Sequence, residues 1–210
     1  MTSLSDHLAR VYGSTDPDTL QRAYQDWARS YNADLAAVGY AYPQLLPALI
    51  TRHVPDTASR ILDAGAGTGW IGGLLQTLGY HNLSGIDLSA DMLAVARTTG
   101  AYRELRRMNL AERVDFDDAS FAACYSVGTF TPGHAPPHGL RELARVVRPG
   151  GCLVVTLTEP AWADYGAVLE KLCEENRLAL VERTPPFPVF PYSPEERHLL
   201  ARLEVHRVLA

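Results

Sequence analysis

From about residue 59 onward, short apolar runs alternate along the chain with amphipathic stretches. Short runs rich in β-branched residues predict buried strands, and apolar positions that recur once per helical turn predict helices that bury one face. We predict strands over seven ranges, 60–64, 83–88, 102–110, 121–127, 152–158, 178–183 and 199–209. We predict helices over four ranges, 70–78, 89–97, 139–147 and 161–176.

The order of these elements indicates the fold. Strands separated by helices form right-handed βαβ units, which place the strands in a parallel sheet with helices on both faces. The last two strands are instead joined by a proline-rich connection over residues 185–194, which is typical of an antiparallel pair. The pattern therefore predicts an α/β fold: a doubly wound, Rossmann-like, mostly parallel seven-stranded sheet with an antiparallel edge strand.

The first part of the chain departs from this alternation. Residues 4–11, 19–36 and 42–53 are predicted helices with no strand between them. We therefore expect residues 1–55 to form an N-terminal helical cap, and residues 56–210 to form the core of a single structural domain.

Three aromatic residues lie on one face of the longest predicted cap helix. Tyr24, Trp27 and Tyr31 are spaced by three and four residues, and such positions are neighbours on a helix surface. Two interpretations follow, and the pattern does not choose between them. The residues form either a stripe that packs into a core or an aromatic cover folded over a ligand pocket.

Composition narrows the class of protein. Of the 210 residues 47% are hydrophobic, which is enough for a sizeable core. The formal net charge is −5 and no long basic run occurs, which argues against nucleic acid as the main partner. No apolar run has the length of a membrane span, and the first residues lack the pattern of a signal peptide, so we expect a cytoplasmic protein with no membrane partner. The three cysteines lack metal-ligand spacing, and no metal site is predicted.

A glycine turn follows the first predicted strand. Asp63 ends this strand, and Gly65, Gly67 and Gly69 follow at alternate positions before a helix begins. Such a turn lets a nucleotide-like ligand lie against bare backbone amides. A carboxylate at the position of Asp63 would repel a pyrophosphate, but it would pair well with a cationic amino group. The turn therefore indicates a ligand that carries an amino acid.

The second predicted strand ends in another acidic residue. Asp87 stands 22 residues beyond Gly65, where a carboxylate can accept both hydroxyls of a ribose, in dinucleotide and S-adenosylmethionine sites alike. Residues 67–72 also satisfy the literal G-x-G-x-x-G string. Counted from Gly65, however, Trp70 stands where the third glycine of a dinucleotide turn belongs. The spacing therefore favours S-adenosylmethionine over a dinucleotide.

Three motifs in this order resemble the class I S-adenosylmethionine-dependent methyltransferases. They are Ile-Leu-Asp-Ala-Gly-Ala-Gly-Thr-Gly at 61–69, Gly-Ile-Asp-Leu-Ser-Ala-Asp-Met-Leu-Ala-Val-Ala-Arg at 85–97 and Val-Arg-Pro-Gly-Gly at 147–151. The resemblance covers residues 59–158. The stretch 125–134, with the upstream Tyr-x-x-Trp-Ala-x-x-Tyr-Asn, is similar to the Williams–Beuren syndrome region methyltransferase-like branch. The resemblance implies S-adenosyl-L-methionine as methyl donor and S-adenosyl-L-homocysteine as product. Because the chain lacks a basic face, we expect a small-molecule acceptor, methylated on oxygen or nitrogen.

The resemblance also implies which residues hold the cofactor. Asp63 would lie near the ammonium group of the methionine part, and Asp87 would bind the ribose. Asn109 stands where the family usually has an acidic residue that reads the adenine amino group, and its side-chain carbonyl can accept that hydrogen bond. The family usually has Phe-Asp at the start of the fourth strand, where this chain has Phe121 and Ala122. The predicted cofactor-binding residues are Tyr24, Tyr31, Asp63, Gly65, Ala66, Gly67, Gly69, Trp70, Asp87, Leu88, Met92, Asn109, Leu110 and Ser126.

Methyl transfer from a sulfonium depends on alignment more than on a protein nucleophile, because the positive sulfur already activates the carbon. A general base assists when the acceptor is a hydroxyl group. His134 follows the fourth predicted strand at the carboxyl edge of the sheet, so it is the first candidate base, and His138 is the second. Alternatively, His134 only shapes its loop. The other histidines, His7, His53, His81, His198 and His206, are predicted surface residues.

Two other functions stay open at this point. The chain could bind S-adenosylmethionine as a sensor, or use it in a reaction that transfers no methyl group, because the case for a catalytic base is slight. A nicotinamide-dependent oxidoreductase is the third possibility, since the ribose-binding position of Asp87 is common to both kinds of site.

Overall fold

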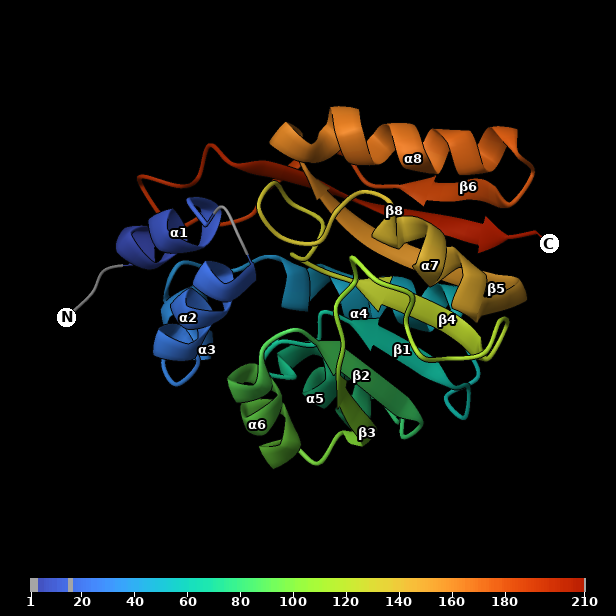
Figure 1. Cartoon of the computed structure of the whole chain (residues 1–210), viewed down its shortest axis with the longest axis horizontal. Coiled ribbons are helices and arrows are strands. Elements are labelled where there is room, and N and C mark those ends of the chain that lie inside the picture. Colours follow the sequence, from blue (N-terminus) through green and yellow to red (C-terminus); the bar gives the residue numbers. More distant parts are fainter. Residues whose placement is uncertain (1–3, 15–16, 210) are drawn as a thin grey trace.

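The computed structural model describes residues 4–14 and 17–209. Its centre is one sheet with the strand order β3-β2-β1-β4-β5-β8-β6, and the short strand β7 pairs with β8 (Figure 1). The strands are β1 (Ile61–Ala64), β2 (Leu83–Asp87), β3 (Tyr102–Arg107), β4 (Phe121–Ser126), β5 (Val147–Thr158), β6 (Leu178–Arg183), β7 (Phe187–Pro188) and β8 (Leu200–Val208). The helices are α1 (Leu4–Tyr12), α2 (Pro17–Trp27), α3 (Tyr31–Ala37), α4 (Tyr42–His53), α5 (Trp70–Thr77), α6 (Ala90–Thr98), α7 (Gly139–Val146) and α8 (Trp162–Glu174).

The pairing of the strands confirms the predicted sheet. β1 to β5 run parallel to one another, and β8 runs antiparallel to both of its neighbours, β5 and β6. The reversed strand β8 lies one position in from the outermost strand β6, and the two-residue strand β7 adds to the seven predicted strands. The strand order reverses between β1 and β4. At such a switch point the loops leave in opposite directions and open a crevice at the carboxyl ends of the strands.

Helices cover both faces of the sheet, so the parallel strands are buried on both sides. On one face, α7 and α8 supply Leu143 and Leu169 to the hydrophobic core. On the other face, α4 and α5 supply Leu49 and Leu75. α4 thus packs on the sheet although it precedes residue 55. The predicted boundary between a cap and a core at that residue stays a prediction.

The helices α1, α2 and α3 gather at one end of the sheet, opposite the C-terminus (Figure 1). We refer to these three helices as the cap. Leu8, Trp27 and Leu35 form the core of the cap together with Val189 and Phe190, which follow β7. The proline-rich connection between β7 and β8 is therefore the surface on which the cap packs.

The helix predicted over residues 19–36 is wrong in one respect: α2 and α3 are separate helices. The break comes after Trp27, whose indole Nε1 donates a hydrogen bond to Oδ2 of Asp34 at 2.8 Å, across the turn. Trp27 is also 1% exposed, in the core of the cap. The apolar spacing continues through the break, so periodicity alone could not reveal a turn that a tertiary hydrogen bond stabilises.

Two histidines predicted on the surface are buried. The ring of His7 stacks on that of Trp27, with centroids 4.9 Å apart. His206 on β8 is 2% exposed, and its Nε2 lies 2.9 Å from Oε2 of Glu204. These predictions are wrong because tertiary contacts bury both rings: His7 packs against an aromatic ring of the cap, and Glu204 is a polar partner for His206.

The cysteines occupy the positions expected of small apolar residues. Cys124 and Cys152 are buried free thiols, and Cys173 is half-buried. Within residues 4–14 and 17–209, no three side chains are grouped as metal ligands would be. Within the same residues, no helix has both the length and the apolar character to cross a bilayer.

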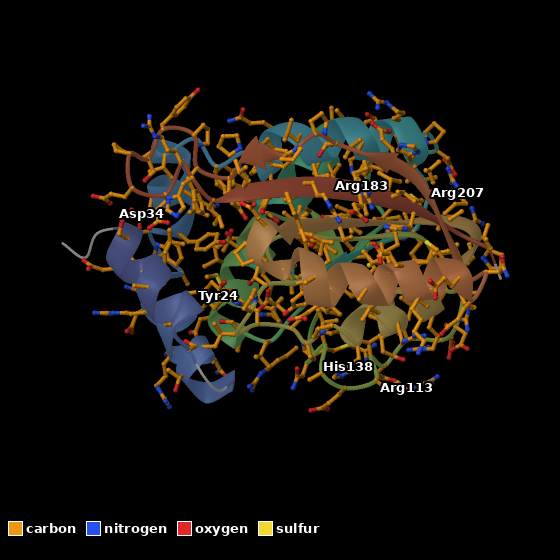
Figure 2. The ribbon with its side chains drawn as sticks, turned by 90° about the horizontal axis from the view of Figure 1, so that it is seen from above. Tyr24, Asp34, Arg113, His138, Arg183 and Arg207 are labelled. Carbon is orange, nitrogen blue, oxygen red and sulfur yellow. The ribbon has the colours of Figure 1, made fainter. Side chains whose placement is uncertain are left out.

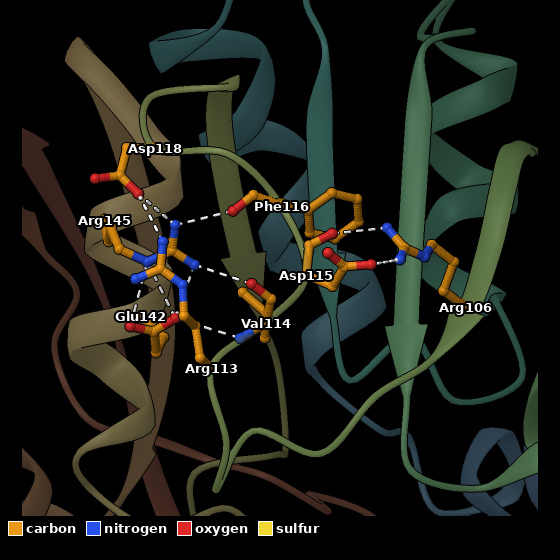
Figure 3. Close-up of polar contacts among 8 residues, drawn as sticks. All are labelled: Arg106, Arg113, Val114, Asp115, Phe116, Asp118, Glu142 and Arg145. Atoms are coloured by element: carbon orange, nitrogen blue, oxygen red, sulfur yellow. Dashed lines mark hydrogen bonds and ion pairs between the residues drawn. The ribbon is translucent and has the colours of Figure 1, made fainter.

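Two arginines hold the long connection between β3 and β4 (Figure 3). Arg145 on α7 donates from Nη1 to the carbonyl of Phe116 at 2.9 Å and from Nη2 to that of Val114 at 3.0 Å. Arg106 on β3 binds Asp115 through both its carboxylate and its carbonyl. The first residues of this connection, 108–111, line the cavity that is described below. The two arginines hold the connection a few residues further along the chain.

Methionine in place of Arg145 is expected to lower the free energy of unfolding by about 1–3 kcal/mol, because two backbone carbonyls lose their donors. Urea denaturation measures this change. Arg113 belongs to the same cluster, but its side chain is 69% exposed, so Arg113→Met is a matched control. The control is expected to stay within about 0.5 kcal/mol of the wild type. Equal losses in the two variants would contradict the assignment.

Candidate active site

A cavity of about 290 Å³ lies where β1, β2 and β4 end, beneath α2 and α3. It occupies the switch point of the sheet, where ligands of open α/β sheets bind. Its lining comes from the turns after these strands, from the loop before α7 and from the cap. The lining residues are Leu20, Gln21, Tyr24, Tyr31, Gly65, Gly67, Ile86, Asp87, Leu88, Ser89, Met92, Met108, Asn109, Leu110, Ala111, Val127, Gly128, Thr129, Gly133, His134, Ala135 and Pro136.

Asp87 joins two of these turns. Its Oδ2 accepts the backbone N–H of Gly67 at 2.8 Å, and its Oδ1 accepts that of Ser89, before α6, at 2.8 Å. Burial raises the pKa of Asp87, whereas the backbone N–H groups around the carboxylate lower it. Each carboxylate oxygen has a further lone pair beyond these hydrogen bonds. Asp87 can therefore accept hydroxyl groups of a ligand while it holds the glycine turn in place.

Two glycines of the turn have different surroundings: Gly65 is packed against a loop, and Gly67 faces the cavity. Gly65 and Gly67 both have left-handed backbone angles, with φ of +89° and +53°. A Cβ on Gly65 would lie 2.0 Å from Oγ1 of Thr129, whereas a Cβ on Gly67 would meet no atom within 4 Å. Gly65 therefore makes room for the loop after β4. Gly67 presents bare backbone to the open cavity.

The end of the cavity beside α6 is apolar, with Leu88, Met92 and Leu110 in its wall. Asn109 lies next to them. Its Oδ1 accepts the backbone N–H of Ala111 at 2.9 Å, so the side chain also shapes the turn that leaves β3. The second lone pair of Oδ1 can accept a hydrogen bond from a ligand amino group.

The cap closes the cavity through a contact between Tyr24 and His134. The hydroxyl of Tyr24 on α2 lies 2.8 Å from Nε2 of His134, and Nδ1 of the same ring lies 2.9 Å from Oγ1 of Thr131. Tyr165 on α8 holds this loop from the other side, with its hydroxyl 2.9 Å from the carbonyl of Thr131. Figure 2 shows Tyr24 on the side of the cap that faces the rest of the molecule.

Burial sets the charge of His134. It lowers the pKa of the ring from 6.5 to about 4. The imidazole is therefore neutral at pH 7 and has one nitrogen able to accept a proton. Both predicted roles of His134 are compatible with this position, because the ring lines the cavity and also shapes its loop.

A second cavity, of about 30 Å³, shares Tyr24, Tyr31, Gly128 and His134 with the first. Aromatic and aliphatic side chains make up most of its wall, and none of its lining residues is an aspartate, glutamate, lysine or arginine. Trp27 belongs to this wall and to the core of the cap, so the aromatic face is part of a core, and its role as a cover over a ligand stays a prediction. The other lining residues are Leu8, Val11, Leu35, Tyr40, Tyr42, Thr131, Thr158, Val189 and Phe190.

Several predicted site residues lie outside the lining of the larger cavity. Ser126 is fully buried and donates a hydrogen bond to the carbonyl of Ala64 at 2.6 Å. Nε2 of His138 lies 3.1 Å from the carbonyl of Ala111, and Figure 2 shows this histidine well separated from Tyr24. The roles of these residues stay predictions. The predicted cofactor-binding residues outside the lining are Asp63, Ala66, Gly69, Trp70 and Ser126.

Comparisons with known proteins decide the family. Residues 62–155 match the family described as "Methyltransferase domain". Methyltransferase-like protein 27 from Homo sapiens is 32% identical over 175 residues, which cover 80% of this chain and 71% of that protein. The chain belongs to the class I S-adenosylmethionine-dependent methyltransferases. The predicted resemblance to the Williams–Beuren branch is confirmed by the same relative, and the nicotinamide-dependent alternative is removed.

Two further similarities extend the comparison. A malonyl-[acyl-carrier protein] O-methyltransferase from Erwinia pyrifoliae is 36% identical over 164 residues, which cover 77% of this methyltransferase and 59% of that enzyme. The chain thus spans less than two thirds of that relative. The solved structure of the [4+2]-cyclase SpnF has a TM-score of 0.71 at 16% identity and covers 94% of this chain and 98% of its own. That likeness shows a shared fold.

The cofactor of the methyltransferase is S-adenosylmethionine, and the larger cavity fits it. Asp87 would accept the ribose hydroxyls, Leu88 and Met92 would pack on the adenine, and Gly67 would bring bare backbone close to the ligand. When bound, the cofactor supplies a methyl group that the positive charge of its sulfur activates. Tyr31 lies over the cavity from the cap and would exclude water from the reacting atoms.

Some residues in the wall of the larger cavity were not predicted from the sequence. Leu20 precedes Tyr24 by one helical turn, so the spacing did contain a signal for it. Thr129 lies in an irregular loop after β4, where no periodicity exists. Met108 follows β3 directly and reaches the cavity because β3 pairs with β2 beside it. Such residues are recruited by the sheet rather than by their local sequence.

Proposed function

We propose that this methyltransferase transfers the methyl group to oxygen or nitrogen of a small, uncharged molecule. The observation that carries the proposal is the wall of the second cavity, which is aromatic and aliphatic and bears no charged side chain. An acceptor seated there would find neither a counter-ion for a charged group nor a way to be solvated. The acceptor would reach the cofactor past Gly128 and His134, which line both cavities.

His134 would act as the general base. With Nδ1 held by Thr131, Nε2 of its neutral ring would take a proton from an acceptor hydroxyl that replaces the Tyr24 hydroxyl there, as the methyl group is transferred. The acceptor would need small movements of the cap, since the second cavity holds about 30 Å³. The net charge of −5 supports an acceptor other than nucleic acid, and we place the reaction in the cytoplasm, as the sequence predicts.

An acceptor screen tests the proposal. S-adenosylmethionine labelled in its methyl group is incubated with the protein and matched sets of neutral phenols, neutral heteroaromatic amines, alkylammonium compounds and carboxylates. Label is expected in the neutral sets. The name of the Erwinia relative makes malonyl-loaded acyl carrier protein a necessary further arm. Label only in the charged sets, or on the carrier protein, would contradict a small uncharged acceptor.

Glutamine in place of His134 is expected to lower kcat for a hydroxyl acceptor about 100-fold or more, because the proton acceptor is lost. The affinity for S-adenosylhomocysteine is expected to change far less, since His134 contributes one side of a large cavity. Turnover kinetics and calorimetry measure the two effects. His198→Gln, on the exposed surface, is the control. If kcat survives in H134Q, the histidine only shapes its loop.

A second candidate function is a reaction that uses the bound cofactor without methyl transfer. Two observations favour it: the low pKa of His134 makes the ring a weak base, and the structural neighbour SpnF is a cyclase. The labelled cofactor separates the candidates. Methyl transfer releases S-adenosylhomocysteine in step with labelled product, whereas the alternative leaves the cofactor intact while an unlabelled substrate is consumed.

A further inference from the structure

The carboxylate of Asp63 is held by two tyrosines. Asp63 is the last residue but one of β1 and is 3% exposed. The hydroxyls of Tyr102 and Tyr125 both donate hydrogen bonds to its Oδ2, at 2.6 and 2.7 Å. Within the described residues, Oδ1 accepts no hydrogen bond. One oxygen of a buried carboxylate is thus saturated, while the other has no donor from the protein.

The sheet register brings the tyrosines to Asp63 from both sides. Tyr125 is the direct partner of Asp63 on β4, and Gly85 is its partner on β2. Tyr102 comes from β3, one strand further away, and its ring lies where the side chain of Gly85 would be. A Cβ on Gly85 would lie 2.6 Å from Leu105 and 3.0 Å from the Tyr102 ring. A side chain at residue 85 would crowd both Leu105 and the Tyr102 ring, so Gly85 leaves room for Tyr102 to reach across β2.

A second glycine completes the slot for this ring. A Cβ on Gly72 of α5 would lie 2.2 Å from the hydroxyl oxygen of Tyr102. Gly72 thus serves the tyrosine and not the cofactor, and it is absent from the cavity lining. Three elements of the fold, β2, β3 and α5, are shaped so that one hydroxyl arrives at one carboxylate oxygen. The two glycines thus make room for the Tyr102 ring, whose hydroxyl reaches Asp63.

We propose that Tyr102 and Tyr125 are positioning residues that keep Asp63 ionised and turn its free oxygen, Oδ1, toward the ammonium group of S-adenosylmethionine. This inference rests on the proposed function and on the role that the family resemblance implies for Asp63, near the methionine part of the cofactor; Asp63 itself lies outside the lining of the larger cavity. The tyrosines occupy Oδ2, so Oδ1 is the oxygen of Asp63 that is left to accept from that group. Their effect on binding is therefore confined to the amino-acid end of the ligand.

Electrostatics explain why a buried carboxylate needs these donors. Burial raises the pKa of Asp63 to about 7, the hydrogen bonds from Tyr102 and Tyr125 lower it, and the charge of Asp87 on β2 raises it. Burial keeps the pKa of both tyrosines well above 10, so they stay protonated as donors. The thiol of Cys124 on β4, the other titratable group close by, likewise stays protonated because burial raises its pKa. Without one hydroxyl, Asp63 would hold its proton to higher pH and lose its attraction for a cation.

Two ligands that differ in the amino-acid part of the cofactor test the proposal. S-adenosylhomocysteine carries the ammonium group, whereas 5′-methylthioadenosine has the same adenosine and thioether sulfur but no amino acid. Calorimetry gives the Kd of each for the wild type, Tyr102→Phe and Tyr125→Phe at about pH 6, 7 and 8. We expect the wild-type affinity for S-adenosylhomocysteine to rise with pH as Asp63 ionises, while the affinity for 5′-methylthioadenosine stays level.

In each variant, the affinity for S-adenosylhomocysteine at pH 7 is expected to fall about tenfold, the usual size of one lost hydrogen bond to a charged group. The rise with pH is expected to move to higher pH, and the affinity for 5′-methylthioadenosine to stay within about twofold. Tyr80→Phe is the control, since its buried hydroxyl donates to the carbonyl of Val54 at 2.6 Å. Equal losses for both ligands, or an unshifted pH profile, would overturn the inference.

These outcomes are independent of methyl transfer. If the wild type binds S-adenosylhomocysteine but labels no acceptor, the proposed function fails and the ligand comparison still decides the role of the tyrosines. If one variant does not fold, the other gives the same comparison, because each removes one of two equivalent donors to Oδ2.

Discussion

Alanine in place of Asp87 is expected to weaken the binding of S-adenosylhomocysteine about 100-fold or more, because hydrogen bonds to a charged group are each worth about 1.5–3 kcal/mol and the ribose makes two. The same change removes the acceptor for the N–H groups of Gly67 and Ser89, so both turns beside the cavity loosen. Cofactor binding and the shape of its site therefore fail together.

Calorimetry with S-adenosylhomocysteine measures this loss, and circular dichroism checks that the variant is folded. Asp91 is the matched control, because it is an acidic residue of the first turn of α6 that does not line the cavity. Asp91→Ala is expected to bind within about twofold of the wild type, as is usual for surface changes away from a site. A folded D87A protein that still binds with the wild-type Kd would show that Asp87 only supports the turns.

Asparagine in place of Asp63 is expected to stabilise the protein at pH 8 while it weakens cofactor binding. The folded protein binds the Asp63 proton up to about pH 7, whereas the unfolded chain releases it near 3.8. The unfolded state therefore binds fewer protons in this interval, and the wild type loses stability as the pH rises from 3.8 to 7. Between pH 5 and pH 8 this loss amounts to about 2–3 kcal/mol, which an uncharged amide avoids.

Urea denaturation at pH 5 and pH 8 measures the difference in unfolding free energy between Asp63→Asn and the wild type. The difference should shift in favour of the variant at pH 8. Asp26→Asn is the control, since that side chain is 69% exposed, and its difference should be the same at both pH values. A D63N protein that is destabilised equally at pH 5 and pH 8 would mean that Asp63 is not a strained carboxylate.

The two predictions together describe a division between stability and binding. Asp63 is expected to weaken the fold at neutral pH, a cost that an ionised carboxylate would offset by holding the ligand. Asp87 would support both the fold and the ligand, because its oxygens accept from the backbone N–H groups of the two turns beside the cavity.

Local sequence determined a large part of this protein. The strand that contains Asp63, the turn at Gly65 and Gly67, and the helix start after Ser89 all follow from short-range rules of backbone angles and capping. Ser89 does cap α6, accepting the N–H of Met92 at 3.2 Å. Because such signals need only neighbours in the chain, the sheet, the crevice and the position of Asp87 were predictable.

Only the tertiary structure decided the contacts between distant segments. The break between α2 and α3 depends on a bond from Trp27 to Asp34, and the cap wall depends on the meeting of Tyr24 and His134, 110 residues apart. Tyr102 read as an ordinary strand residue, yet strand pairing and the absence of a side chain at Gly85 place its hydroxyl on Asp63. The glycine turn identified the cofactor from local geometry. The charge state of its carboxylate is a property of packing, because burial and two hydroxyls from other strands set it.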